Sequence, residues 1–217
     1  MLGEQLLEST NMEYKMGAIR GLCFTYLHMG DRAKALQYAD MMPPAEDLHV
    51  HVLEGNELTE HCQNYFWKVC DKMYLYMKYL LDCTDAGYTH EEKHEMLETL
   101  YNMFHMIFSN QDFGYWHDRL ARISFFMALE SGKAGQFERA MEELEKLLIY
   151  LENYKGFTGI SHSSLLVNKI KIGQSNIAKS SEETLGHAYL RYLNNNDNVF
   201  ASIKDDPRYL NIKERLS

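Results

Sequence analysis

Several residue types that would direct the chain toward other classes of protein are scarce. The 217 residues include only 3 Pro, and Val and Ile together are scarcer than Leu. This composition counts against β-strands and predicts an all-α protein. No apolar run approaches the roughly 20 residues that a membrane-spanning helix needs, because Lys68, Asp71 and Lys72 interrupt the richest stretch, 65–81. We therefore expect no membrane contact.

Basic residues are also few. The chain has 22 Lys and Arg against 31 Asp and Glu, a formal net charge of −9. A protein that binds nucleic acid neutralises phosphates with clustered Lys and Arg, so this balance argues against direct DNA binding. The first residues lack the basic start and apolar centre of a signal peptide, which predicts a cytoplasmic protein.

The 4 cysteines do not suggest disulfides. Cys62 and Cys70 fall on one predicted helix and lie about 12 Å apart along its axis, beyond the reach of a disulfide. Cys23 and Cys83 sit in apolar helical patterns, and no CxxC is present. We interpret all four as reduced core thiols.

Hydrophobic periodicity predicts about nine helices in one domain, 1–217. Thr89 and Glu92 predict a capping box, and Asp206-Pro207 predicts the start of a last short helix. Residues 155–180 lack periodicity and are predicted to be an irregular segment, followed by C-terminal helices over 181–217. The other helices are predicted over 11–28, 32–42, 48–53, 57–82, 89–108, 113–132 and 138–154.

Two predicted hairpins, 11–43 and 112–154, resemble each other in spacing. Each has a helix-breaking turn, at Gly30 and at Gly135, followed five residues later by a small residue, Ala35 or Ala140. Small residues permit the close crossing of helices that tetratricopeptide repeats show. The pattern predicts a tetratricopeptide-like array of antiparallel helical hairpins that forms a right-handed superhelix.

Five stretches, distributed between residues 26 and 216, resemble the C-terminal regulatory part of bacterial Xre-type helix-turn-helix transcription regulators. The stretches are YLHMGDRAKALQYADMMP (26–43), GYTHEEKHEMLETL (87–100), DFGYWHDRLARISFFMALESGKAGQFERAMEELEKL (112–147), SHSSLLVNK (161–169) and FASIKDDPRYLNIKERL (200–216).

The resemblance implies a regulatory module that dimerises and senses a ligand, often a peptide. In that family, DNA is bound by an N-terminal helix-turn-helix domain. Residues 1–10 already resemble the end of a helix that leads into the repeats, so we expect that domain to be absent from this chain. The chain is then either the regulatory part alone or a stand-alone relative.

Candidate ligand-binding residues are those that fall on the predicted inner helix faces. Arg holds a carboxylate through two hydrogen bonds, and Asn offers a donor and an acceptor to a peptide backbone. The candidates are Arg20, Asn64, Arg119 and Arg122. Arg20 and Phe24 take the inner positions of the first hairpin, so the Lys/Asn set of a chaperone-type carboxylate clamp is absent there. The aromatic stretch 65–79 is more typical of a core than of a ligand box.

The string His90-Glu91-Glu92-Lys93-His94 satisfies HExxH, the pattern of zinc hydrolases. Its position at a charged helix start argues against that activity, because zincins carry the pattern inside a buried helix. His49 and His51 lie two residues apart and point to different sides of a helix, so we expect no metal there. His117 is either part of a polar ligand site or on a solvated helix face.

No other pattern indicates catalysis. The GxxG at 156–159 lacks a strand-turn-helix context. Ser161, His162, Ser163 and Ser164 are adjacent in sequence, but no acidic partner is indicated. We expect a non-enzymatic protein without cofactor or metal, which binds a peptide or protein ligand and forms a homodimer. The alternatives are a generic protein–protein scaffold and, less favoured, a zinc-dependent hydrolase that uses His90, Glu91 and His94.

Overall fold

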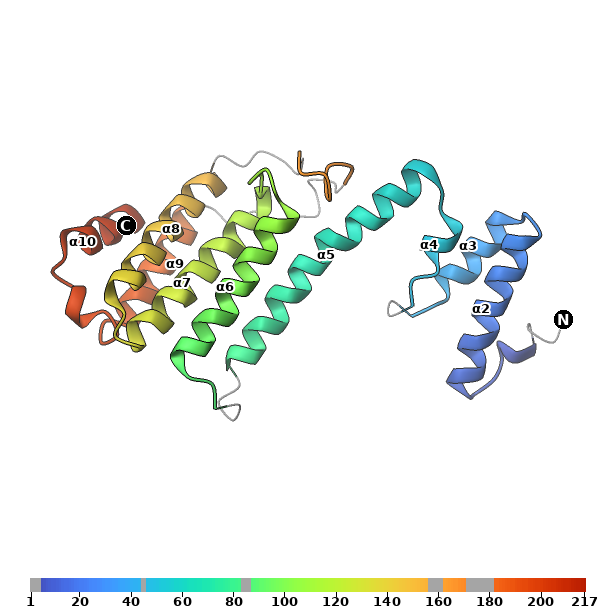
Figure 1. The fold of residues 1–217 in the computed structure, drawn as a ribbon, viewed down its shortest axis with the longest axis horizontal. Helices are drawn as coiled ribbons and strands as arrows, with labels where there is room; N and C mark the ends of the chain where they lie inside the picture. The colour runs from blue at the N-terminus through green and yellow to red at the C-terminus, as the bar shows by residue number, and fades with distance from the viewer. Residues whose placement is uncertain (1–4, 44–45, 83–86, 156–161, 171–181) are drawn as a thin grey trace. The chain divides into compact units, whose positions relative to one another are not determined.

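The computed structural model describes residues 5–43, 46–82, 87–155, 162–170 and 182–217, and every regular element in these ranges is helical (Figure 1). The prediction of an all-α protein is therefore confirmed for the described residues. The chain divides into two compact units, Met1–Tyr65 and Phe66–Ser217, where the sequence predicts a single domain over 1–217. Among the described helices, none has both the length and the apolar character that a bilayer crossing requires.

The N-terminal unit contains α2 (Met12–His28), α3 (Arg32–Asp40), α4 (His49–Val52) and the first part of α5 (Gly55–Asp82). The side chain of Asn11 caps α2 by accepting from the backbone N–H groups of Glu13 and Tyr14. Asp31 caps α3 in the same way. The helices enclose a small apolar core made of Ile19, Leu22, Cys23, Tyr26, Ala35, Ala39, Met42, Leu48 and Val52.

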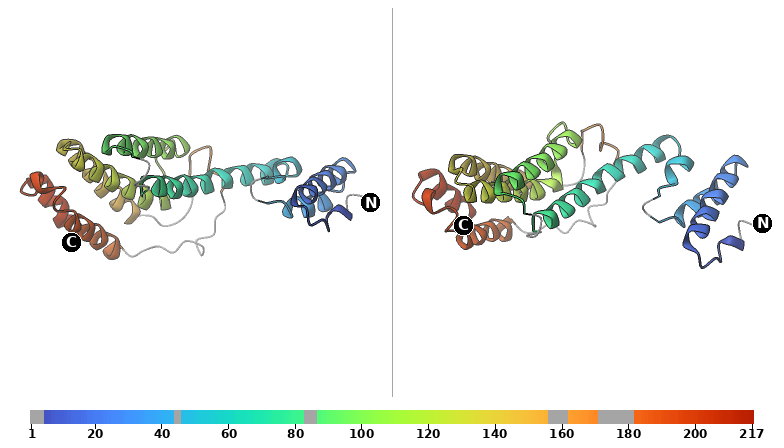
Figure 2. Two further views of the ribbon diagram at one scale, coloured as in Figure 1. Left: turned by 90° about the horizontal axis from the view of Figure 1, so that it is seen from below. Right: turned by 60° about the horizontal axis from the view of Figure 1, so that its bottom comes forward.

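The C-terminal unit contains the rest of α5, then α6 (His90–Ile107), α7 (His117–Lys133), α8 (Phe137–Lys155), α9 (Glu182–Asn195) and α10 (Pro207–Leu216). Two 3₁₀ turns, Gly114–Trp116 and Ala201–Ile203, precede α7 and α10. Helix α7 lies between α6 and α8 (Figure 1) and is buried on most of its circumference. Figure 2 shows α9 and α10 beside α8, at the end of the unit away from α6.

Aromatic side chains form the centre of the C-terminal core. Trp116 is fully buried, and its ring centroid lies 4.8 Å from that of Trp67 on α5 and 5.6 Å from that of Phe104 on α6. Cys70 is also fully buried and free, which agrees with the expected core thiol. Of the aromatic side chains in the stretch 65–79, Trp67 and Tyr74 pack against this core. The others are exposed, so the core role that the sequence predicts holds for only part of the stretch; they are Tyr65, Phe66, Tyr76 and Tyr79.

The α2–α3 and α7–α8 turns have the same geometry. Gly30 and Gly135 adopt φ values of 77° and 76°, a left-handed conformation that favours glycine. After each glycine, a backbone N–H reaches back five residues, from Asp31 to Tyr26 O over 2.9 Å and from Gln136 to Ser131 O over 2.8 Å. This is the Schellman pattern that ends many helices.

The helix starts agree closely with the sequence. Thr89 and Glu92 form the expected capping box of α6, and Asp206 caps α10 with Pro207 in its first turn. Of the predicted irregular segment 155–180, residues 162–170 are described and contain turns without a regular helix. Cys83, the GxxG at 156–159 and Ser161 lie outside the described residues.

The segment 162–170 is held by Asp112. Its carboxylate accepts hydrogen bonds from the Ser163 backbone N–H and from the Ser164 hydroxyl, the latter over 2.6 Å. His162 donates through Nδ1 to the Asp112 carbonyl oxygen over 2.6 Å. In a catalytic triad the histidine stands between the acid and the serine. Here Asp112 accepts a hydrogen bond directly from the Ser164 hydroxyl, which is not the arrangement of a triad. The contacts instead attach residues 162–164 to the loop before α7.

Candidate functional site

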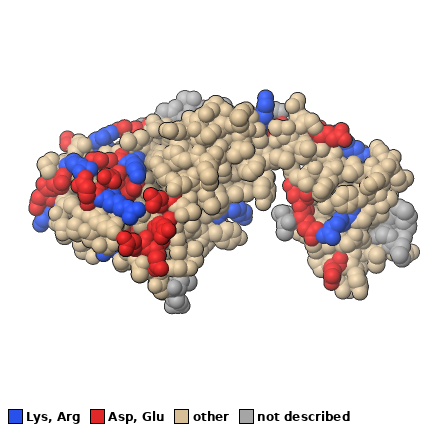
Figure 3. All heavy atoms as spheres, in the orientation of Figure 1, with Lys and Arg blue, Asp and Glu red and all other residues tan. Residues whose placement is uncertain are grey.

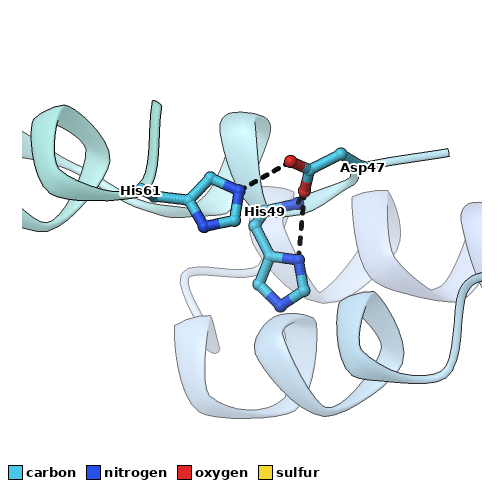
Figure 4. A group of neighbouring side chains, drawn as sticks. All are labelled: Asp47, His49 and His61. Atoms are coloured by element: carbon cyan, nitrogen blue, oxygen red, sulfur yellow. Dashed lines mark hydrogen bonds and ion pairs between the residues drawn. The ribbon is translucent and has the colours of Figure 1, made fainter. Parts of the chain in front are cut away.

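Three side chains of the N-terminal unit converge at the start of α5 (Figure 4). Asp47 precedes α4, His49 opens α4 and His61 lies on α5. The Asp47 carboxylate lies between the two imidazoles, with Oδ2 2.6 Å from His61 Nε2 and Oδ1 3.2 Å from His49 Nδ1. One ligand atom from each residue lies within 4.8 Å of the other two.

A second carboxylate borders this cluster. Asp40, the last residue of α3, lies with Oδ1 2.9 Å from His49 Nε2, so His49 has a carboxylate at each ring nitrogen. Burial raises the pKa of Asp47, but hydrogen bonds from His61 and His49 outweigh this effect and hold the pKa below its usual value. Asp47 is therefore an anion at neutral pH, suited to a cation or to charged donors.

The local sequence fixes this arrangement through short-range contacts. The Asp47 side chain accepts from the His49 backbone N–H over 3.1 Å, which positions the start of the four-residue helix α4. Leu48 and Val52 are buried and attach α4 to the core. Gly55 adopts a φ of 55°, so the chain turns there into α5 and brings His61 back toward Asp47.

A groove with a volume of about 1150 Å³ runs along α2 in the same unit. Its lining includes Gly17 and Gly21, one helical turn apart and both exposed, where an added Cβ would meet no atom within 4 Å. The α2 backbone is therefore accessible along this face. The remaining lining residues are Leu6, Glu13, Tyr14, Met16, Ala18, Arg20, Leu22, Thr25 and Glu46.

Arg20, a predicted ligand-binding residue, lies in this groove. Its guanidinium is about half exposed and forms an ion pair with Glu46. The pair places both signs of charge at one edge of an otherwise mainly apolar groove. Asn64 belongs to the same unit, lies on α5 and is half-buried, but it is not among the residues that line the groove.

Arg119 and Arg122, the other two predicted ligand-binding residues, belong to the C-terminal unit and share one partner. Arg119 Nη1 lies 2.8 Å from Asp118 Oδ2, and Arg122 Nε lies 3.3 Å from Asp118 Oδ1. Arg119 also stacks over the ring of Tyr74, 5.0 Å from its centroid. Arg122 lines a cavity of about 260 Å³ between α5, α7 and α9, bounded by Tyr74, Lys78, Phe125, Phe126, Leu185, Ala188, Tyr189 and Tyr192.

The HExxH string has its own contacts. His90 is the first residue of α6 and donates through Nδ1 to Glu130 over 2.6 Å, while Gln136 donates to Glu91. His94 is buried, and burial lowers its pKa. In the described part of the chain, the string is not among the groups whose donor atoms could hold a metal ion.

The remaining histidines of interest differ in environment. His51 stays outside the cluster, as its spacing from His49 predicts, and its ring packs against that of Phe24 in a tilted arrangement with a centroid distance of 5.3 Å. His117 is buried rather than on a solvated face, and burial lowers its pKa to about 4. It also borders a small cavity with Tyr101, Gln111 and Tyr150. A polar site at His117 stays a prediction.

Sequence reasoning missed the contribution of Asp47 and His61. Fourteen residues and a helix boundary separate the two, and no standard ligand spacing relates them. Comparison of the chain with protein-family models, with curated proteins and with solved structures finds no match.

Proposed function

We propose that this protein is a non-catalytic regulatory module that binds an extended peptide in the groove along α2. The resemblance to the regulatory part of Xre-type regulators suggests the class of function. The observation that carries the proposal is the groove itself, because the resemblance alone names no site. In this proposal the protein acts in the cytoplasm and contacts DNA only through a separate helix-turn-helix domain.

The chemistry of the groove suits a peptide. Gly17 and Gly21 lie four residues apart on the face of α2 that lines the groove, so this face carries no side chain at either position. A peptide backbone can therefore approach the helix closely there. Leu6 and Tyr14 are exposed apolar side chains at its border, where they offer contacts to apolar peptide side chains. The Arg20–Glu46 pair is exposed enough to exchange partners, so Arg20 is available to a peptide carboxylate.

Filling the groove tests this proposal. Peptides are first selected on the immobilised full chain from a random decapeptide library. The strongest peptide is then titrated by calorimetry into the wild-type chain, Gly17→Leu, Gly21→Leu and Ala33→Leu. Ala33 is an exposed small residue on α3 outside the groove, so Ala33→Leu is the matched control.

The two glycine variants should lose binding by at least tenfold, and the control should keep it. Replacement of an exposed helical glycine also removes a helix penalty of about 1 kcal/mol, so neither variant should unfold. Equal affinity in all four proteins, or failure to select any peptide, would contradict the proposal.

We also propose that the helix pairs α2–α3 and α7–α8 are tetratricopeptide-like repeats of a right-handed array. Two features support this. The pairs share the same turn geometry at Gly30 and Gly135, and Ala35 and Ala140 are both fully buried at the equivalent position after each turn.

The proposed homodimer would use the exposed apolar face of α5 in the C-terminal unit. Leu75, Tyr76, Tyr79 and Leu80 lie on one side of the helix, and Tyr76 and Tyr79 are about two-thirds exposed. Light scattering should show a dimer for the wild type and a monomer for the Tyr76→Glu/Tyr79→Glu variant. Met106→Glu, an equally exposed position on α6, should remain dimeric. A monomeric wild-type chain would exclude this interface and leave the peptide proposal intact.

A further inference from the structure

The cluster of Asp47, His49 and His61 has the composition of a transition-metal site (Figure 4). Two imidazole nitrogens and one carboxylate form the donor set, which suits Zn²⁺, whereas Mg²⁺ and Ca²⁺ prefer oxygen alone. We propose that these three residues bind one Zn²⁺ ion, independently of any peptide.

The distances are close to those that a bound ion requires. Zinc holds nitrogen and oxygen ligands at about 2.0–2.1 Å, so two ligands of a tetrahedral site lie about 3.4 Å apart. Asp47 Oδ1 and His49 Nδ1 are 3.2 Å apart, and Asp47 Oδ2 and His61 Nε2 are 2.6 Å apart. One ligand atom from each of the three residues lies within 4.8 Å of the other two, so side-chain rotations that bring these atoms to about 3.4 Å from one another would admit the ion.

Asp40 completes the arrangement from outside the ligand set. Its carboxylate faces His49 Nε2 at 2.9 Å and favours the tautomer with the proton on that nitrogen. Zinc would replace the Nδ1 proton that Asp47 Oδ1 accepts in the metal-free protein, and it would bind the Nδ1 lone pair and the carboxylate in its place. Zinc-binding histidines commonly donate their other N–H to a carboxylate in this way.

The site is accessible and joins separate elements. The three side chains are between about one quarter and one third exposed, so an ion can enter from solvent. Its ligands come from the segment before α4, from the first residue of α4 and from α5. Bound zinc would thus connect α5 to α4, and three protein ligands leave a fourth position for water.

Calorimetric titration of ZnCl₂ into the chelator-treated, reduced full chain tests this proposal. The wild type should bind one ion per chain, and His61→Ala should abolish this binding. Asp40→Asn keeps all three ligands and should lower the affinity about 10- to 100-fold without changing the stoichiometry. Circular dichroism of each variant checks its helix content.

Two control variants make the test specific. His51→Ala removes a neighbouring histidine outside the cluster, and Cys62→Ser removes the free thiol next to His61. Both should bind zinc as the wild type does.

The proposal fails if the wild type does not bind one ion, if His61→Ala binds as tightly as the wild type, or if His51→Ala or Cys62→Ser loses the ion. If His61→Ala loses helix content, Asp40→Asn decides the question, and unchanged affinity in that variant contradicts the proposed geometry.

Discussion

Replacement of Ala140 by Leu tests the packing of the α7–α8 pair. Ala140 is fully buried on α8, in the first turn after the Gly135 turn. Leucine adds three carbon atoms at a position with no solvent exposure, so we expect neighbouring side chains or backbone to shift. Overpacking of this kind typically costs about 1–3 kcal/mol. With a urea dependence of about 2 kcal/mol/M, a loss of 2 kcal/mol lowers the unfolding midpoint by about 1 M.

The assay can observe the C-terminal unit alone. Both Trp residues of the chain, Trp67 and Trp116, belong to this unit, so tryptophan fluorescence reports its unfolding. Glu91→Gln is the control in the same unit, because Glu91 is exposed and its one described side-chain contact is the bond from Gln136, which a glutamine can still accept. Its free energy of unfolding should stay within about 0.5 kcal/mol of the wild type, which is a midpoint shift of at most about 0.25 M.

Equal midpoints for Ala140→Leu and Glu91→Gln would refute the reasoning. The α7–α8 crossing would then tolerate a large residue, and the repeat register that pairs Ala140 with Ala35 would be wrong. Ala35→Leu extends the same test to the N-terminal unit. Its urea unfolding is monitored by circular dichroism, with Glu57→Gln as the control variant. Glu57 lies on α5 with its side chain about two-thirds exposed, in an ion pair with Arg32.

Three further predictions concern other positions. Gly132→Ala should destabilise the protein by about 1–3 kcal/mol, because the added Cβ would lie 2.7 Å from Val199 Cγ1, whereas Gly17→Ala, in open space, should stabilise it by about 0.5–1 kcal/mol in urea denaturation. Burial lowers the pKa of His117 from its ordinary 6.5 to about 4 in the folded protein. As the pH falls below 6.5, His117 is therefore protonated in the unfolded chain before it is protonated in the folded protein. Stability should therefore drop by about 3 kcal/mol between pH 6.5 and 4, and His117→Gln should lose that part of the pH dependence. Given a net charge of −9, a mobility-shift assay at physiological salt should detect no sequence-selective DNA binding by the chain alone, and sub-micromolar selective binding would contradict this.

Surface charge is consistent with that last expectation. In Figure 3, acidic and basic side chains lie interleaved on the visible face of the C-terminal unit. Arg208 contacts both Glu138 and Glu145, and Arg215 pairs with Glu152. These basic groups are already paired with carboxylates and do not form a separate basic surface for phosphates.

Local signals made the helices predictable. Caps at Thr89 and Asp206 and the glycine turns at 30 and 135 depend on residues within one turn of the chain, so the sequence contains the whole signal. The same holds for Ala35 and Ala140, whose burial follows from the apolar face of each helix. Division of the chain into two units is not a local property, and the pattern along α5 gives no sign of it.

The candidate site was less accessible to sequence reasoning. His61 meets Asp47 because Gly55 turns the chain between them, and no residue spacing encodes that contact. The groove likewise depends on how Leu6 and Glu46 approach α2. Of the four predicted ligand-binding residues, Arg20 lines this groove, and the roles of Asn64, Arg119 and Arg122 stay predictions.

Hydrogen exchange with and without the selected peptide tests the central claim, that α2 forms the ligand site, most directly. The account predicts that the peptide protects amides in the described segments that line the groove, those of α2 and those around Leu6 and Glu46, and leaves α7 and α8 unchanged. Protection confined to residues 66–217, with α2 exchanging as in the free protein, would contradict it.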